Sequence, residues 1–352
     1  MQPICYSLVY IVPAFATAGL LLGGPWLALA PALVFGVIPI AELVFPAPTT
    51  NPDAEETKSR LSNWGYDAVI YMALPVQFGL IALLGSLVSS GALAGYEILG
   101  AILSVGLSCG ALGINVGHEL GHRADRRHQL AGKVILSTSL YAHFFIEHNR
   151  GHHARVATDE DPATSRKGEW VQAFWFRSLI GGYLSAWKLE AVRLARRGQS
   201  PWTWNNEMIR LQVGQALLLL AFYSAFGAQA MLAFIGASLV GALLLETVNY
   251  VEHYGLRRER NERGKWERVR PAHSWNSNGI VGRLLLFELT RHSDHHAYPK
   301  RAYSVLRHFD EAPQLPTGYP GMILLALVPP LFFAVMHPRI PTKPVTTEIQ
   351  AA

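Results

Sequence analysis

Charged residues and cysteines are both scarce in this chain of 352 residues. Only 16% of the residues are charged and 50% are hydrophobic, whereas a soluble domain usually has about a quarter charged residues. The two cysteines, Cys5 and Cys109, both lie in apolar runs, which excludes a disulfide scaffold and any metal centre held by a CxxC pair. No GxGxxG motif follows an expected strand, so the sequence indicates no nucleotide or flavin site.

The missing charge leaves long apolar stretches, each close to the roughly 20 residues that a membrane-spanning helix needs. We therefore expect an all-α, polytopic membrane protein with six transmembrane helices. The expected spans are residues 4–22, 26–43, 67–89, 96–116, 211–227 and 231–251. Short turns join them into three hairpins. The first stretch lacks the charged start and cleavage site of a secretory signal, so we expect it to be retained.

One further apolar stretch, residues 322–336, is interrupted by Pro329 and Pro330. A segment this short and broken predicts a re-entrant element rather than a seventh span.

The 30 basic residues avoid the three short turns and lie in the other loops or at the helix ends that face them. The positive-inside rule then predicts that both termini and these loops lie on the cytoplasmic side of a bacterial-type inner membrane. We expect residues 1–352 to form one integral-membrane domain, with cytoplasmic segments at 117–210 and 252–320.

Nine of the fourteen histidines fall into four groups at the expected cytoplasmic helix ends. The groups are His118 and His122; His148, His152 and His153; His253; and His292, His295 and His296. A spacing of four residues predicts one helical face for His118 with His122, and another for His148 with His152. Burying so many imidazoles is costly unless they share a purpose, and metal coordination is the usual one.

Nine nitrogen donors exceed the needs of one ion, so two ions with four or five donors each are expected. Imidazole suits zinc, copper, iron and nickel, so the donor type alone does not select the metal. His118-Glu-Leu-Gly-His122 also matches the HExxH signature of zinc proteases, although that interpretation uses only two of the nine histidines. A metal transporter or sensor is a further alternative, but transporters place their ligands near the membrane midplane.

Around these histidines the sequence reads HELGH at 118–122, EHNRGHH at 147–153, NYVEHYGL at 249–256 and RHSDHHA at 291–297. The four motifs resemble the histidine boxes of integral-membrane non-haem diiron enzymes, and most closely those of the alkane 1-monooxygenase (alkane hydroxylase) branch. The resemblance covers about residues 113–320. Arg123 and Thr290 depart from the residues common at those positions, and neither departure removes a histidine.

The resemblance implies hydroxylation of the terminal methyl group of medium-chain n-alkanes to primary alcohols, with O2 and two electrons. It implies that the nine histidines hold two iron ions, with no bound flavin, NAD or haem and no nucleic acid partner. The alkane would enter from the bilayer. Electrons would come from rubredoxin, which a flavin-dependent NAD(P)H reductase reduces. A xylene-type side-chain monooxygenase and a fatty-acyl desaturase or hydroxylase of the same superfamily remain alternatives.

Metal-bound histidines usually donate their second N–H to a carboxylate or carbonyl group. The candidates for this role near the boxes are Glu119, Glu147, Glu252 and Asp294, with Asp159, Glu288, His143 and His273 as further neighbours. Basic residues are dense in 257–270, which predicts a docking surface for an acidic rubredoxin. Plain positive-inside charge or contact with anionic lipid explains the same residues equally well.

Overall fold

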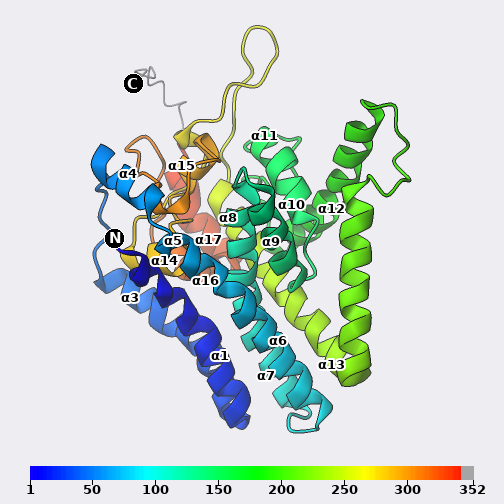
Figure 1. Ribbon diagram of the computed structural model, residues 1–352. Helices are drawn as coiled ribbons and strands as arrows, with labels where there is room; N and C mark the ends of the chain where they lie inside the picture. The colour runs from blue at the N-terminus through cyan, green and yellow to red at the C-terminus, as the bar shows by residue number, and fades with distance from the viewer. Residues whose placement is uncertain (342–352) are drawn as a thin grey trace.

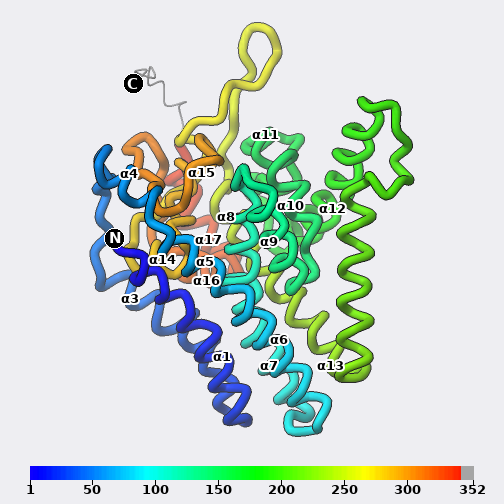
Figure 2. Tube along the Cα trace, viewed as in Figure 1, coloured from blue at the N-terminus to red at the C-terminus, as the bar shows by residue number. Residues whose placement is uncertain are grey.

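The computed structural model describes residues 1–341, and within that range it is built of helices without a β-strand (Figures 1 and 2). The α-helices are α1 (Ile11–Leu22), α2 (Leu29–Ala32), α3 (Ile38–Val44), α4 (Ala54–Ser62), α5 (Gly65–Tyr71), α6 (Ala73–Ser89), α7 (Tyr96–Ser108), α8 (Asn115–His122), α9 (Arg126–Ser137), α10 (Phe144–Glu147), α11 (His153–Arg155), α12 (Val171–Ala195), α13 (Glu207–His253), α14 (Ile280–Leu285), α15 (His292–Ala297), α16 (Tyr319–Ala326) and α17 (Pro329–Met336). Short 3-10 helices lie at Pro3–Tyr10, Gly24–Ala28, Pro271–His273, Tyr303–Val305 and His337–Arg339, and π-helical turns at Leu33–Val37, Cys109–Ile114 and His148–His152.

Five continuous helical segments are long and apolar enough to cross a membrane: Pro3–Leu22, Gly24–Val44, Gly65–Ser89, Tyr96–His122 and Glu207–His253. The chain is therefore an all-helical membrane protein, as the apolar stretches predicted. The fourth segment extends beyond the expected end at residue 116 and includes the whole of the first histidine motif.

The expected fifth and sixth spans both fall within α13, which accounts for five segments where six spans were expected. Gly227 interrupts this 47-residue element with φ 82° and ψ 177°, a backbone conformation that glycine adopts far more readily than other residues. In Figure 1 the chain descends along one arm of α13, reverses, and ascends along a second arm to the centre of the molecule.

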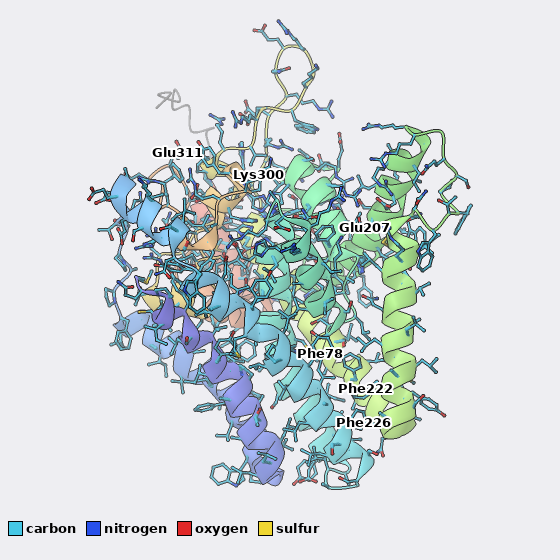
Figure 3. All side chains as sticks on the ribbon, in the orientation of Figure 1. Phe78, Glu207, Phe222, Phe226, Lys300 and Glu311 are labelled. Atoms are coloured by element: carbon cyan, nitrogen blue, oxygen red, sulfur yellow. The ribbon has the colours of Figure 1, made fainter. Side chains whose placement is uncertain are left out.

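Polar and apolar side chains gather at different ends of the molecule. Figure 3 places Phe78, Phe222 and Phe226 along the lower halves of the spans, whereas Glu207, Lys300 and Glu311 lie toward the upper end. The short helices α8, α10, α11 and α15 lie above the membrane segments α1, α6 and α7 in Figure 1. The histidine-bearing elements therefore lie at one end of the spans.

Glycines allow the ascending arm of α13 to pack closely against α7 and the π-helical turn that follows it. A methyl group added at Gly106 would lie 2.5 Å from Cβ of Val240, and one added at Gly241 would lie 2.6 Å from Cβ of Cys109. Small residues at such crossings let helix backbones approach in a membrane, where packing rather than the hydrophobic effect drives association.

We expect Gly106→Ala to destabilise the protein by about 1–3 kcal/mol, the usual range for overpacking. The branched Cβ of Val240 is fixed to the backbone and cannot rotate away from the added methyl group. Thermal unfolding in detergent micelles measures the effect. Gly79→Ala is the matched control, because nothing lies within 4 Å of the added methyl group and alanine is the better helix former. Equal unfolding temperatures for the two variants would contradict the packing argument.

The stretch expected to re-enter the membrane forms two short helices, α16 and α17, on either side of Leu327 and Val328. Buried residues of both helices pack with Tyr250 and Tyr254 at the end of α13 and with Val171 and Phe174 of α12. The break between α16 and α17 directly precedes Pro329 and Pro330, as the two prolines predicted. Its first helix brings Tyr319 to the side of the histidine-bearing elements.

Candidate metal centre

All nine histidines of the four motifs come together in two adjoining groups. One group contains His118, His122, His148, His153 and His295; the other contains His152, His253, His292 and His296. Within each group, one ring nitrogen of every member lies within 4.8 Å of the others. The two groups contact each other where the rings of His153 and His296 stack, with centroids 4.3 Å apart.

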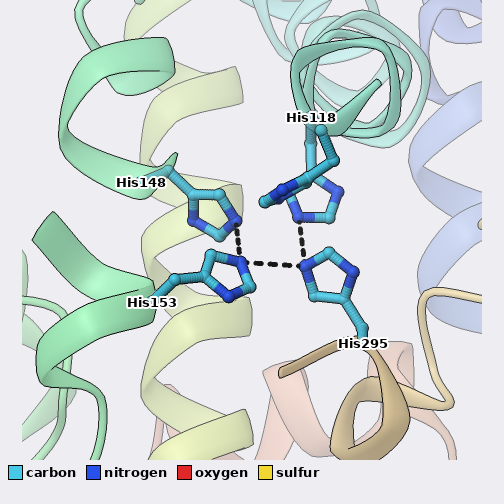
Figure 4. A group of neighbouring side chains, drawn as sticks. His118, His148, His153 and His295 are labelled. Carbon is cyan, nitrogen blue, oxygen red and sulfur yellow. Dashed lines mark hydrogen bonds between the residues drawn. The ribbon is translucent and has the colours of Figure 1, made fainter. Parts of the chain in front are cut away.

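Ring nitrogens in the first group face one another directly (Figure 4). The Nε2 atoms of His118 and His295 are 2.9 Å apart, those of His295 and His153 are 3.1 Å apart, and those of His153 and His148 are 3.0 Å apart. A ring nitrogen of a neutral imidazole either carries one hydrogen or accepts one. At most two of these three contacts can therefore be hydrogen bonds.

A cation bound by both nitrogens would explain the contact that cannot be a hydrogen bond. Two nitrogens bound to one ion at about 2.0–2.1 Å lie roughly 3 Å apart, which is the spacing that these Nε2 atoms show. In the second group, the Nε2 atoms of His152 and His296 and those of His292 and His253 are each 3.3 Å apart. The donor set fits a metal ion in each group.

Burial favours the neutral form of five of the six metal-group histidines that lie outside the spans; the exception is His152, whose pKa is raised because Asp161 outweighs the effect of burial. Burial lowers the pKa of His148, His153, His292, His295 and His296 well below its usual value. A neutral imidazole offers a lone pair to a metal, whereas an imidazolium does not.

The second histidine motif is wound differently from the helix that its spacing predicted. Residues His148–His152 form a π-helical turn, whose hydrogen bonds span five residues instead of four. His148 therefore joins His153 in the first group, and His152 faces the second. His148 and His152 do lie side by side, as their spacing predicted, since their rings stack with centroids 5.2 Å apart, but the two residues belong to different metal groups.

A buried arginine holds α15, the helix of the last motif, in place. Arg291 is 1% exposed and donates to the backbone oxygens of Leu306 at 2.8 Å and Thr50 at 3.0 Å. Burial lowers its pKa to about 10, so it stays charged at neutral pH. Just before it, Glu288 has a positive φ of 58° and accepts from Arg283 at 2.6 Å. These bonds fix the entry of the chain into α15.

Three of the four carboxylates expected to accept from histidine have arginine partners instead. Glu119 accepts from Arg123 at 2.9 Å, Glu147 from Arg155 at 2.7 Å, and Asp294 from Arg301. The fourth, Glu252, does contact a histidine: its Oε2 atom is 3.0 Å from Nε2 of His292.

Asp161 is the carboxylate that the sequence interpretation missed. Its Oδ2 atom accepts from Nδ1 of His152 at 2.8 Å and from the Thr164 hydroxyl at 2.6 Å. Burial alone would raise the pKa of Asp161, but His152 and Thr164 lower it below its usual value. Asp159, which was considered instead, is exposed and pairs with Arg257.

The remaining candidates lie outside both groups. Nδ1 of His273 accepts from the backbone N–H of Arg270 at 3.0 Å, and the ring of His143 contacts Tyr141 and Tyr183. Within residues 1–341, the Thr290 hydroxyl has no hydrogen-bond partner. Glu119 faces Arg123, which disfavours the zinc protease interpretation because the glutamate of HExxH would have to act as a base at the metal.

A mainly apolar cavity of about 80 Å³ ends on the histidines. His118 and His148 of the first group and His292 of the second line it, together with Glu252 and Tyr319. Its other walls include Val34, Ala111, Leu244, Leu286 and Ile323, from the second and fourth membrane segments, α13, the turn after α14, and α16. A nonpolar molecule in this cavity would contact both metal groups.

The helical fold and the histidine-lined cavity define a membrane metalloenzyme. Consistent with this class, the family model for fatty acid desaturases matches residues 96–326, a range that includes all nine histidines.

Curated relatives narrow the class. The chain is 46% identical over 324 residues to alkane 1-monooxygenase 2 of Pseudomonas aeruginosa, covering 90% of this chain and 84% of the relative. It is 40% identical to alkane 1-monooxygenase 2 of Alcanivorax borkumensis, covering 95% and 88%. It is 31% identical to the xylene/toluene monooxygenase hydroxylase component of Pseudomonas putida, covering 96% and 88%. The chain belongs to the alkane 1-monooxygenase family, and it is an oxidoreductase of the monooxygenase type.

Proposed function

We propose that this protein hydroxylates the terminal methyl group of medium-chain n-alkanes to primary alcohols. The reaction combines the alkane with O2, two electrons and two protons and yields the alcohol and water. The observation that carries the proposal is the apolar cavity that ends on histidines of both groups. The alkane 1-monooxygenase relatives at 40–46% identity support the choice of substrate.

We propose that the nine histidines hold two iron ions, five histidines in one group and four in the other. Bound iron would supply the activation of O2 that a strong, unpolarised C–H bond requires. The chain itself orients the substrate and excludes water, because Leu244, Leu286 and Ile323 surround the approach to the histidines. An alkane has no polar group to anchor, so the shape of this cavity selects which carbon reaches the metal.

The orientation in the membrane is also part of the proposal. Both termini, segments 117–210 and 252–320, and the metal centre would lie on the cytoplasmic side of the inner membrane, with 1–352 acting as one integral-membrane domain. The segregation of Lys and Arg supports this arrangement. Rubredoxin, reduced by a flavin-dependent NAD(P)H reductase, would then deliver electrons from the cytoplasm, and alkane would enter from the bilayer.

The test is a metal and product analysis of detergent-purified protein. We expect about two irons per chain, since nine imidazoles exceed one ion's needs, and octan-1-ol from octane with O2, rubredoxin, reductase and NADH. Zinc, or a single metal ion, would overturn the diiron centre. Iron with no octanol but with oxidation of a xylene methyl group would favour the side-chain monooxygenase, which the 31% relative makes the second candidate.

We expect Ala111→Leu to shorten the range of alkanes accepted. Ala111 lines the cavity and precedes His118 by seven residues, about 10 Å along a helix, so its side chain meets the substrate far from the reacting methyl group. The turnover of decane relative to hexane should fall at least about tenfold. A loss of this size is usual when an apolar pocket has no space for one methylene group of the substrate. Leu103→Phe, on an exposed face of α7, is the control. A parallel loss of both activities would indicate damage to the fold instead.

The basic segment 257–270 forms a projecting loop, drawn in yellow at the top of Figure 1. Arg257 pairs with Asp159 and Arg260 with Glu160, so part of its charge is neutralised. Within residues 1–341, the structure records no ion pair for three other basic residues of the loop, which are Arg263, Lys265 and Arg268.

We expect reversal of these three charges to glutamate to slow rubredoxin-dependent turnover several-fold at low salt, with unchanged iron content. The difference should shrink as salt rises, because screening weakens the attraction between the loop and an acidic carrier. Steady-state rates at several rubredoxin concentrations measure it. The double variant Arg126→Glu/Arg127→Glu, on exposed positions of α9, controls for net charge. Unchanged rates in the triple variant would exclude the loop as the docking surface.

A further inference from the structure

We propose that Glu252 supplies a carboxylate donor to the metal ion of the four-histidine group, and that Tyr319 positions it. This inference rests on the metal centre of the proposed function and adds an oxygen ligand to a site otherwise built of imidazoles. Glu252 is 1% exposed, precedes His253 in α13, and lines the apolar cavity.

The carboxylate contacts the ring nitrogen of His292 that faces another histidine of the same group. Oε2 of Glu252 is 3.0 Å from Nε2 of His292, and the same Nε2 is 3.3 Å from Nε2 of His253. Nε2 of His292 thus has a donor atom on either side, each at roughly the 3 Å spacing of ligands on one ion. Asp161 provides the contrast, because it contacts Nδ1 of His152, which is the far side of the ring and the usual place for a carboxylate that orients a ligand.

The carboxyl group of Glu252 also lacks a cationic partner of the usual kind. Glu119, Glu147 and Asp294 each pair with an arginine. Among the described residues, the recorded salt-bridge contact of Glu252 is to Nε2 of His292. A buried carboxylate without a cation is costly. A divalent ion beside His292 and His253 would remove that cost.

Tyr319 leaves one carboxylate oxygen free for this role. Its hydroxyl donates to Oε1 of Glu252 at 2.6 Å, and Oε2 faces the histidines. Tyr319 is 2% exposed and begins α16, so the N-terminal end of that helix fixes the direction of the carboxylate. With Glu252 included, each metal group has five donors, but only the second has an oxygen among them.

The competing arrangement is a simple hydrogen bond from Nε2–H of His292 to Glu252. That arrangement would remove His292 from the metal and leave three histidines in the group. The two arrangements differ in how the bound metal responds when the carboxylate charge is removed without a change of shape.

The experiment compares Glu252→Gln, Glu252→Asp and Tyr319→Phe with wild type, each reconstituted with ⁵⁷Fe and examined by Mössbauer spectroscopy. Glu246→Gln is the matched control, because Glu246 is a buried carboxylate of the same helix that accepts from Tyr141 at 2.8 Å. We expect Glu252→Gln to alter the Mössbauer signal of one iron. The affinity for that iron, measured by competition with a chelator, should fall at least about tenfold, a loss typical of substitutions at metal sites. Glu252→Asp, which withdraws the oxygens, should alter the same signal.

Tyr319→Phe removes only a hydroxyl group and should shift the same iron signal by less, which tests the positioning role if Glu252→Gln does not fold. Signals and affinities equal to those of wild type in Glu252→Asp and Tyr319→Phe would overturn the proposal. An unaltered signal in Glu252→Gln, with both irons retained, would do the same and favour the hydrogen bond. Wild-type protein that binds no iron would instead refute the proposed function, so the two failures are distinguishable.

Discussion

His295→Ala is expected to abolish alkane hydroxylation and to release iron from the five-histidine group. His295 is central to that group, because its Nε2 atom contacts the Nε2 atoms of both His118 and His153. Alanine removes one nitrogen donor, and the remaining histidines of the group lose the ring that lies between His118 and His153. Iron per chain and octanol formation, measured on the same preparation, should fall together.

His128→Ala is the control for this loss. His128 lies outside both groups and bonds to the Tyr71 hydroxyl at 2.7 Å, so its removal should leave iron content and turnover close to wild type. Full iron content and activity in His295→Ala would refute the assignment of His295 to a metal group. Loss of iron in both variants would indicate that the substitutions destabilise the histidine-bearing helices in general.

Asp161→Ala is expected to weaken metal binding by about 10–100-fold, the usual cost of losing a carboxylate that orients a ligand histidine. Asp161 holds Nδ1 of His152, so that Nε2 of the same ring faces Nε2 of His296. Without the carboxylate, the His152 ring loses its orientation and the N–H on its far side loses its acceptor. Competition with a chelator measures the affinity directly.

Asp159→Ala is a close control, since it changes the same residue type two positions away. Asp159 is exposed and pairs with Arg257, and an exposed pair contributes little to stability. Its substitution should leave metal affinity unchanged. If the two variants lose metal equally, Asp161 does not act through His152.

The convergence of the nine histidines was predictable because it follows from local spacing and from the ends of the spans. His118 and His122 lie one helical turn apart, and both belong to the first group. The end of α13 carries His253 to the same place. Burial of imidazoles at one end of apolar helices has few explanations other than a metal, so the pattern was informative without knowledge of the packing.

The division of the histidines between the groups was not predictable in this way. The π-helical turn at His148–His152 depends on a hydrogen-bond register that tertiary packing selects, and the motif carries no signal for it. Asp161 reaches His152 across a turn in which Ala157 has a positive φ of 58°. By contrast, Glu119 and Arg123 are four residues apart on one helix, a spacing typical of ion pairs, so the partner of Glu119 could have been inferred.

The anchoring of Arg291 to the loop between the second and third membrane segments sets an order of events during synthesis. Its bond to Thr50 joins residues 241 positions apart. At about 5–20 residues per second, the ribosome needs roughly 10–50 s to pass from one to the other. The first spans therefore enter the membrane long before α15 exists, and neither histidine group is complete until then. Metal ions can therefore fill both groups only after nearly the whole chain has been made, when the first spans already lie in the membrane.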